Sequence, residues 1–298
     1  MNFKLKKIFQ KRYYLISWFK ILSQKLMLDI LGSGEKILIT SIPKSGTHLL
    51  EKVFAEFLNY EKFGDGINRL YSINSEGRFS ETKKRLSWLP RSAFISSHMF
   101  FDDELYQVII NKNIKVILSV RDPRDLVLSA ANYIKEEAHP YSPHFRGTSL
   151  EEVINQVIIG IDGPLYVHKP KKLKSPIFKD YKHNLQGGIF ETCQRFLRWE
   201  GVGQALRINF EDLVGSKGGG CDEKQKETIL RISEFCSVQL LDIDLDNIKN
   251  NLFGESSTFR KGQIGSWKKV FTDENIKIFK ECSGDLLVKM GYELDNNW

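Results

Sequence analysis

The fold is decided by the stretch KILITSI at residues 36–42, which is followed by the turn PKSGTH at residues 43–48. The first stretch is short, apolar and rich in β-branched residues, which predicts a buried strand. Residues 49–58 then place apolar side chains at helical spacing, so we expect a helix with one buried face after the turn. A strand, a tight turn and a helix in this order open an α/β nucleotide-binding unit.

Three more strands are expected along the chain, at residues 93–100, 115–120 and 205–210. Each is short and apolar, and helical stretches separate them. This alternation predicts a single α/β domain in which helices flank a central, mostly parallel sheet. Ligands bind such sheets beyond the carboxyl ends of the strands, and the motifs described below lie there.

Composition agrees with one globular domain. The chain has 298 residues, of which 41% are hydrophobic and 27% charged, and no Pro-, Gly- or Ser-rich linker divides it. We expect an N-terminal segment at residues 1–30 and one domain at residues 31–298. The four cysteines form no CxxC pair and no Cys/His spacing that suits zinc, so no metal is expected.

The N-terminal segment, residues 1–30, is strongly basic. It holds seven lysines and arginines against Asp29 alone, and thus carries +6 of the chain's formal net charge of +7. With its aromatic residues, it could lie on an anionic membrane surface as a peripheral contact. Alternatively, it is a helix that packs on the body with its lysines in water. The apolar run at residues 13–19 is too short to span a bilayer, so we expect a cytoplasmic protein.

The first chemical motif is the turn PKSGTH at residues 43–48. Backbone amides in a tight turn between a strand and a helix point at one spot, and the positive end of the helix adds to their attraction for a phosphate or sulfate. Gly46 allows the chain to approach the anion closely, and Lys44 adds a mobile charge. The motif is not a Walker A sequence, because GxxxxGK[ST] is absent. An ordinary turn with a surface lysine is the alternative.

The second motif, RDPRD at residues 121–125, directly follows a predicted strand and is followed by Ser129. Arg121 at the strand end could bind a phosphate with two parallel hydrogen bonds. Ser129 lies within reach of the same anion if the turn enters a helix, which Asp125 could cap. A loop held by Arg–Asp salt bridges is the alternative.

The third motif, RKGQIGSWK at residues 260–268, combines cations, glycines and an aromatic residue in a way that suits a loop over an anionic ligand. A solvated basic loop is the alternative. A further glycine run at residues 218–220 does not open a helix after a strand, so we interpret it as a surface connection.

Together the three motifs resemble those of the soluble PAPS-dependent sulfotransferases, where PAPS is 3′-phosphoadenosine 5′-phosphosulfate. The turn at residues 43–48 is similar to the family's PKSGTTW, and residues 121–129 and 260–272 are similar to its 3′-phosphate and C-terminal motifs. The resemblance spans residues 36–292 and implies a P-loop-NTPase-like sulfotransferase fold. It also implies that residues of all three motifs bind PAPS and its product PAP. These residues are Lys44, Ser45, Gly46, Thr47, His48, Arg121, Ser129, Phe210, Arg260, Lys261 and Gly262.

The resemblance also implies the catalytic residues. His98 ends the stretch AFISSH at residues 93–98 of a predicted strand, where the family places its catalytic histidine, and would act as general base. Lys44 would stabilise the phosphate that leaves. Phe210, in the stretch NFEDL, matches a family aromatic residue that touches adenine.

The chain departs from the family pattern at four positions that bear on the site. Leu49 stands where the family has Trp, Phe210 where it has Tyr, Ser96 where it has Lys, and Ser266 where it has Asp. The family's dimer motif would fall on residues 268–277, but its Val and Glu are absent there. The oligomeric state therefore stays open.

The predicted reaction moves a sulfuryl group from PAPS to a hydroxyl or amine of a small-molecule acceptor and releases PAP. Two alternatives are a nucleotide-dependent small-molecule kinase and a non-catalytic PAP(S)-binding protein. Nucleic acid is not an expected partner, because no recognition module is readable. Several aromatic residues suggest a ring-bearing acceptor. They are Phe63, Tyr71, Trp88, Phe100, Tyr133, Tyr141, Phe145 and Tyr166.

Overall fold

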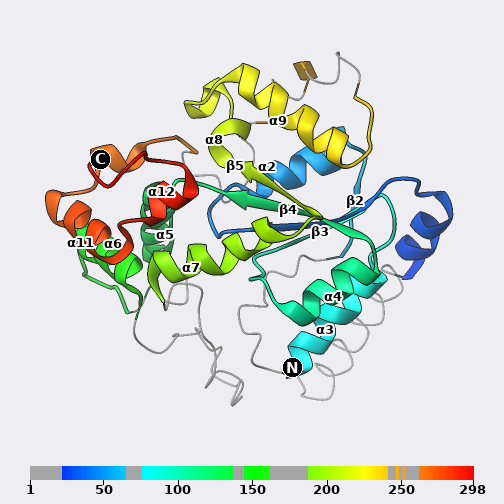
Figure 1. The fold of residues 1–298 in the computed structure, drawn as a ribbon, viewed down its shortest axis with the longest axis horizontal. Helices are drawn as coiled ribbons and strands as arrows, with labels where there is room; N and C mark the ends of the chain where they lie inside the picture. The colour runs from blue at the N-terminus through cyan, green and yellow to red at the C-terminus, as the bar shows by residue number, and fades with distance from the viewer. Residues whose placement is uncertain are drawn as a thin grey trace, which may run out of the picture.

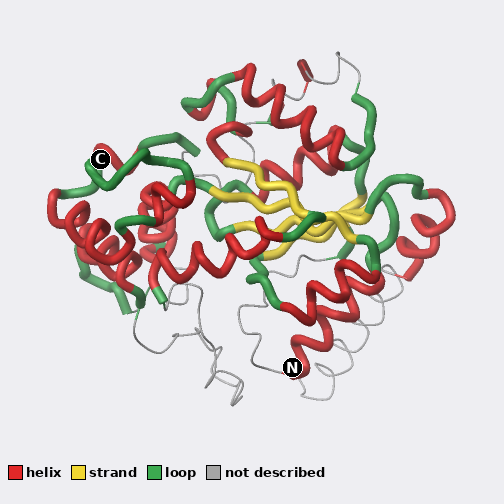
Figure 2. The backbone as a smooth tube through the Cα atoms, in the orientation of Figure 1, coloured by secondary structure: helices red, strands yellow, loops and turns green. Residues whose placement is uncertain are grey.

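The computed structural model describes residues 22–64, 76–136, 142, 144–161, 187–240, 246–247, 251–252 and 262–298. Within these ranges the chain forms an α/β domain around one sheet (Figures 1 and 2). Most of the N-terminal segment and of the stretch between residues 137 and 186 lies outside them. The predicted boundary between residues 30 and 31 thus stays a prediction.

The sheet has five parallel strands in the order β2-β3-β1-β4-β5. The strands are β1 (Lys36–Ser41), β2 (Glu61–Lys62), β3 (Ala93–Ser97), β4 (Ile114–Val120) and β5 (Ala205–Asn209). β1 lies at the centre and pairs with β3 on one side and β4 on the other. The carboxyl ends of these three strands therefore meet at one edge, from which the loops of the site emerge (Figure 1).

Helices cover both faces of the sheet (Figure 1). One face carries α2 (Thr47–Lys52), the π-helix Val53–Phe57, α8 (Phe210–Leu213) and α9 (Asp222–Phe235). The other face carries α3 (Glu76–Trp88), α4 (Asp103–Asn111), α5 (Pro123–Lys135), α6 (Leu150–Ile159), α7 (Gly188–Leu197), α11 (Asp273–Ser283) and α12 (Leu286–Met290). Short 3₁₀ helices lie at Arg198–Gly201, Ser216–Gly218 and Ser266–Lys269.

β1 explains why the fold needs two helical layers. Its side chains alternate between the faces, so Ile37 and Ile39 pack against α2 and α9, whereas Leu38 packs against the opposite layer. All three side chains are fully buried. A strand that is apolar on both faces is typical of a parallel sheet covered on both sides, and the predicted architecture is confirmed.

Two details differ from the sequence prediction. β3 ends at Ser97, so His98 lies in the loop just after the strand and residues 98–100 are not part of it. β2 was not predicted, because it has only two residues, Glu61 and Lys62, and both are exposed. It pairs with the edge of β3 through backbone hydrogen bonds that no apolar pattern reveals.

Candidate active site

The loop that joins β1 to α2 makes a tight turn. Lys44 and Gly46 adopt left-handed backbone conformations with φ of 75° and 93°. The amide of Ser45 donates to the carbonyl of Ile42 over 3.0 Å. α2 begins at Thr47, so the amides of its first turn and its positive end are directed at the loop.

Gly46 lies directly on the ring of Phe210. A Cβ at position 46 would come within 2.7 Å of Phe210 Cδ2, so a larger residue would displace either the loop or the ring. Phe210 is only 3% exposed, and it also contacts the guanidinium of Arg121, whose Cζ lies 4.2 Å from the ring centroid. Phe210 therefore links Gly46 of the loop to Arg121.

Two members of the loop motif direct their side chains elsewhere. The Ser45 hydroxyl is buried and donates to the carbonyls of Ile42 (2.7 Å) and Ser119 (2.9 Å). It thus ties the loop to β4. The His48 side chain is 52% exposed, and its Nδ1 lies 3.1 Å from a carboxylate oxygen of Glu51. Neither side chain is held at the centre of the turn.

His98 is held against the end of β1. Its Nδ1 lies 2.8 Å from the carbonyl oxygen of Ser41 and 3.0 Å from the Ser41 hydroxyl. Donation from Nδ1 to the carbonyl places the lone pair of the neutral ring on Nε2. The Ser41 hydroxyl also lies 2.6 Å from Thr47 Oγ1, which links the histidine to the first residue of α2.

The surroundings of His98 favour its neutral form. Burial lowers the pKa of His98 below its ordinary value of 6.5, and the nearby cationic groups of His48 and Lys44 lower it further. The backbone hydrogen bond to Ser41 and the Glu51 carboxylate oppose this shift without reversing it. A neutral imidazole with a defined lone pair is the form that can accept a proton.

Glu51 anchors a polar cluster beside this site. Its carboxylate accepts hydrogen bonds from Lys62 Nζ (2.7 Å), the Ser96 hydroxyl and His48. Burial by itself would raise the pKa of Glu51, but these three donors outweigh burial and lower the pKa to about 2. The cluster ties α2 to β2 and β3 just before His98.

The Lys44 side chain extends towards α5. Its Nζ lies 4.3 Å from the centroid of the Tyr133 ring, a cation–π contact. Tyr133 lies in the last turn of α5, four residues after Ser129, so the two share one face of the helix. Ser129 is partly exposed, and α5 thus presents both residues towards the loop.

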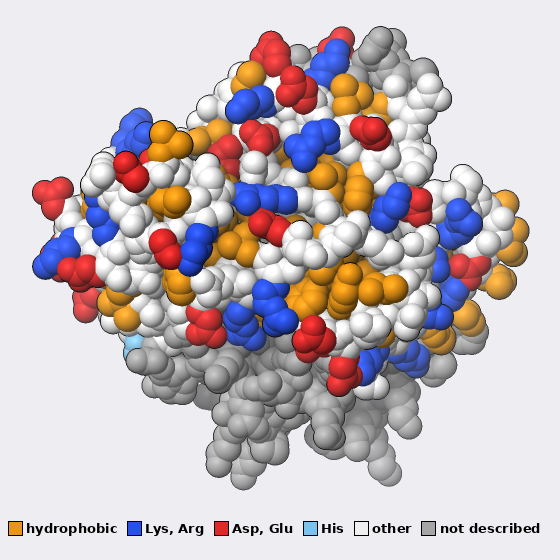
Figure 3. All heavy atoms as spheres, in the orientation of Figure 1, with side chains coloured by type: hydrophobic (Ala, Val, Ile, Leu, Met, Phe, Trp, Pro, Cys, Tyr) orange, Lys and Arg blue, Asp and Glu red, His pale blue; other side chains and the backbone are white. Residues whose placement is uncertain are grey.

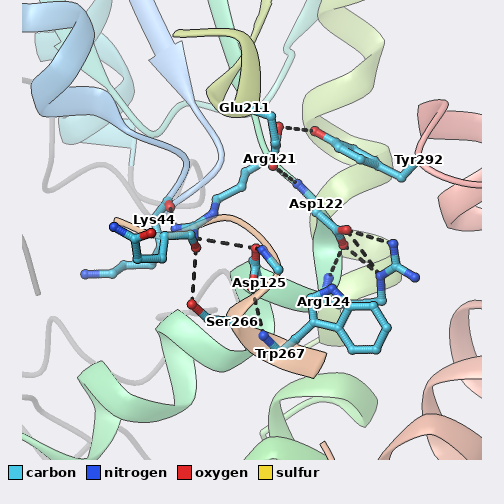
Figure 4. A network of polar contacts seen from close by, with 11 residues as sticks. Lys44, Arg121, Asp122, Arg124, Asp125, Glu211, Ser266, Trp267 and Tyr292 are labelled. Carbon is cyan, nitrogen blue, oxygen red and sulfur yellow. Dashed lines mark hydrogen bonds and ion pairs between the residues drawn. The ribbon is translucent and has the colours of Figure 1, made fainter. Parts of the chain in front are cut away.

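Arg121 joins two of the predicted motifs. It follows β4, is 7% exposed, and donates from one NH group to the carbonyl of Lys44 (3.3 Å) and from the other to the carbonyl of Gln263 (2.9 Å). A carboxylate oxygen of Asp125 lies 3.7 Å away. Figure 4 shows the side chain running from the end of β4 to Lys44. Within the described part of the chain, its buried Nε has no hydrogen-bond partner.

Asp125 holds the third motif in place. Its carboxylate accepts from the backbone amides of Gly265 (2.7 Å) and Trp267 (3.1 Å), as Figure 4 shows for Trp267. Burial raises the pKa of Asp125, although Arg121 and these two amides oppose the rise. The expectation that Asp125 caps the helix is wrong. The cap is Asp122, which accepts from the amide of Arg124, because Pro123 occupies the first helical position.

Arg124 forms a second cluster behind the motif. It donates to Asp122 (2.8 Å) and to Glu293 (2.6 Å), and its Cζ lies 4.2 Å and 4.7 Å from the ring centroids of Trp267 and Trp298. These contacts hold the start of α5 against Trp267 of the third motif and against the C-terminal residues Glu293 and Trp298.

The structure therefore brings Lys44, Gly46, Arg121 and residues 262–265 together at the carboxyl edge of the sheet. Arg260 and Lys261 lie outside the described residues, whereas Gly262 is described and has a φ of 53°. Sequence reasoning missed Ser41, Glu211 and Gln263, and it named Tyr133 only as an aromatic residue for the acceptor and not as a partner of Lys44. Glu211 accepts from the Asp122 amide (2.9 Å) and the Tyr292 hydroxyl (3.0 Å), and these contacts depend on the tertiary structure.

Comparison with known proteins decides the family. The family described as sulfotransferase domain matches residues 34–291. The chain belongs to the sulfotransferase family. The predicted family, fold and enzyme class, a PAPS-dependent sulfotransferase, are thereby confirmed.

Individual relatives of this sulfotransferase are distant. It is 21% identical to sulfotransferase 6B1 of Mus musculus over 253 residues, which cover 84% of this chain and 76% of the relative. It is 22% identical to flavonol 3-sulfotransferase of Flaveria bidentis over 273 residues, with coverages of 81% and 78%. Its fold is similar to that of mouse sulfotransferase SULT7A1 complexed with PAP, with a TM-score of 0.59, 19% identity, and coverages of 89% and 88%.

The described residues lack two further features. No helix in these ranges combines the length and the apolar character needed to cross a bilayer. In the same part of the sulfotransferase, no group of three or more His, Cys, Asp or Glu side chains is arranged to hold a metal ion.

Proposed function

We propose that this sulfotransferase transfers the sulfuryl group of PAPS to a hydroxyl or amine of a small-molecule acceptor, with His98 as general base and Lys44 beside the leaving phosphate. The observation that carries the proposal is the convergence of three motifs on Arg121. Its guanidinium contacts the loop of Lys44 and the loop of Gln263, and its buried Nε has no acceptor among the described residues.

The residues present fit an anionic nucleotide. A buried guanidinium donor without an acceptor is costly, and a phosphate oxygen would satisfy it with a charge-assisted hydrogen bond. Arg121 and Ser129 would hold the 3′-phosphate, together with Arg260, Lys261 and Gly262 from the third motif. Gly46, Thr47 and the amide of His48 would surround the phosphosulfate, while Ser45, whose amide and hydroxyl bond within the fold, would hold the loop in shape. Phe210 would support this loop and contact the adenine ring.

The chemistry requires a proton acceptor and a cation on opposite sides of the reacting sulfur. PAPS supplies an activated sulfuryl group when it is bound. By analogy with phosphoryl transfer, the protein then contributes mainly positioning and charge neutralisation. Nε2 of His98 would accept the proton of the acceptor's hydroxyl or amine, and Lys44 Nζ would neutralise the charge on the departing phosphate.

We propose a ring-bearing acceptor, in agreement with the name of the relative from Flaveria bidentis, flavonol 3-sulfotransferase. Of the aromatic residues proposed to mark its pocket, however, Phe63, Phe100 and Phe145 are at most 4% exposed and therefore fill the core. Tyr71, Tyr141 and Tyr166 lie outside the described residues. Among the described ones, Tyr133 is 39% exposed and its ring lies beside Lys44, so we propose that Tyr133 meets the acceptor. The cytoplasmic location stays a prediction.

The test is a transfer assay with radiolabelled PAPS and a panel of phenols, alcohols and amines, on wild type and His98→Ala. Removing a general base lowers kcat by roughly 10²- to 10⁴-fold, while PAP affinity should stay within about twofold of wild type. In the wild type, the rate should decline as pH falls through the lowered pKa of His98, below 6.5. His144→Ala is the matched control, because His144 is exposed.

The alternatives give different outcomes in the same assay. A kinase would bind ATP or GTP in place of PAP and would transfer phosphate to the panel. A non-catalytic binding protein would bind PAP, yet wild type and His98→Ala would be equally inactive across all acceptors. An acceptor screen without preference for ring-bearing compounds would contradict the acceptor class alone.

A further inference from the structure

The helix at residues 22–31 exposes an unusual number of large aliphatic side chains. Their exposed fractions run from 48% for Leu22 to 74% for Leu31. The five residues are Leu22, Leu26, Met27, Ile30 and Leu31. Orange side chains gather at the right-hand edge of Figure 3, where Figure 1 draws this helix in blue. We call these five residues the aliphatic face.

The opposite side of the helix is docked on the domain. Leu28 is 7% exposed and belongs to the core on the α3 and α4 side of the sheet. Gln24 Nε2 donates to the carbonyl of Lys62 (3.1 Å), and the amide of Gly32 donates to the carbonyl of Leu28 (2.8 Å). The helix therefore has a settled orientation, and the aliphatic face points away from the body.

Cations lie on this helix and next to it. Lys25 belongs to the helix, and Arg91 donates to the carbonyls of Ser33 (3.0 Å) and Gly34 (3.3 Å) just after its end. The acidic residue of the helix, Asp29, is already paired with Lys25, and the nearby Glu35 is paired with Lys115. The preceding residues 1–21 add six lysines and arginines and no acidic residue.

From this juxtaposition we propose that the aliphatic face is a docking surface for an anionic lipid membrane. Aliphatic side chains of such a face enter the boundary between headgroups and acyl chains, while flanking lysines and arginines meet the acidic headgroups. A second copy of the chain fits less well, because pairing two identical faces would bring two sets of cations together. The proposal does not depend on the bound nucleotide or on the transfer reaction.

The test is sedimentation of the full chain with vesicles of phosphatidylcholine alone and with vesicles of equal phosphatidylcholine and phosphatidylserine. We expect binding to the mixed vesicles, at least tenfold weaker binding to the neutral ones, and release by raised salt. Leu26→Glu with Ile30→Glu should weaken binding to the mixed vesicles by at least tenfold. Both side chains are more than 60% exposed, so the fold should tolerate the change.

The matched control is Leu294→Glu with Asn297→Glu, which adds the same charge at exposed positions near the other end of the chain. This variant should bind vesicles like wild type, and both variants should bind PAP like wild type. The proposal is overturned if wild type ignores the mixed vesicles, or if the two double variants lose binding equally. It is also overturned if light scattering shows a dimer that Leu26→Glu with Ile30→Glu dissociates.

Discussion

Arg121 and Arg124 lie three residues apart near the start of α5. They differ in whether the protein supplies a hydrogen-bond acceptor for each of their guanidinium N–H groups. Arg124 is 4% exposed and its guanidinium is fully engaged, by the carboxylates of Asp122 and Glu293 and by two indole rings. Arg121 is 7% exposed, donates to two carbonyls and leaves its Nε without an acceptor in the described part of the chain.

Within one short motif, this difference distinguishes an arginine that stabilises the fold from an arginine that we propose to bind a ligand. A buried arginine whose partners are all supplied by the fold stabilises that fold. A buried arginine that still lacks an acceptor supports our proposal that an external anion binds there. The sequence RDPRD offers both arginines as candidates, and only their surroundings distinguish them.

The largest effect should follow removal of Arg124. Arg124→Ala leaves the buried carboxylate of Asp122 without its ion-pair partner, which typically costs about 3–5 kcal/mol. Urea denaturation should show this loss in the free energy of unfolding. Arg85→Ala serves as control, because Arg85 is 37% exposed and its ion pair with Glu81 lies on the surface of its own helix. A loss for Arg124→Ala as small as the control's would contradict the structural role.

Glu51, like Arg124, has partners that the fold supplies, so we expect it to stabilise the protein. Because its pKa is depressed to about 2 from 4.5, the stability that it contributes is present above pH 4.5 and is lost as pH falls towards 2. Glu51→Gln should therefore destabilise the protein most near neutral pH. Its destabilisation should shrink by about 2 kcal/mol between pH 6 and about pH 3. A destabilisation that is constant over this range would contradict the role of the ionised carboxylate.

Substitution of Tyr133 should give the smallest effect, a loss of activity, because Tyr133 contacts Lys44 of the proposed nucleotide site. Its ring restrains Lys44, and a cation–π contact at a partly exposed position is worth about 0.5–1 kcal/mol. Tyr133→Leu should therefore lower kcat/KM for PAPS about two- to fivefold, as initial rates at varied PAPS would show. Tyr133→Phe keeps the ring and should match wild type. Equal losses in both variants would assign the effect to the hydroxyl instead.

The sequence was a good guide where local pattern decides the structure. The strands β1, β3, β4 and β5 and the helix that follows the turn at residues 43–48 were predicted because their apolar residues repeat with the right period. The sequence also contains a signal for the start of α5. Pro123 at the first helical position indicates Asp122 as the cap, and not Asp125.

The rest of the site depends on contacts between distant residues. The Nδ1 of His98 meets Ser41 across 57 positions, and Arg121 meets Gln263 across 142. No periodicity or spacing encodes such pairs, so Ser41 and Gln263 could not be predicted. The difference between Arg121 and Arg124 could not be predicted either, because it depends on which acceptors the folded chain places around each guanidinium.

The central claim is that Arg121 belongs to a nucleotide site, and isothermal titration with PAP tests it most directly. We predict that wild type binds PAP and that Arg121→Ala binds it about a hundredfold more weakly, since a hydrogen bond to a charged group is worth about 1.5–3 kcal/mol. The exposed Lys226→Ala should bind like wild type. Failure of well-folded wild type to bind PAP, or unchanged affinity in Arg121→Ala, would contradict the account.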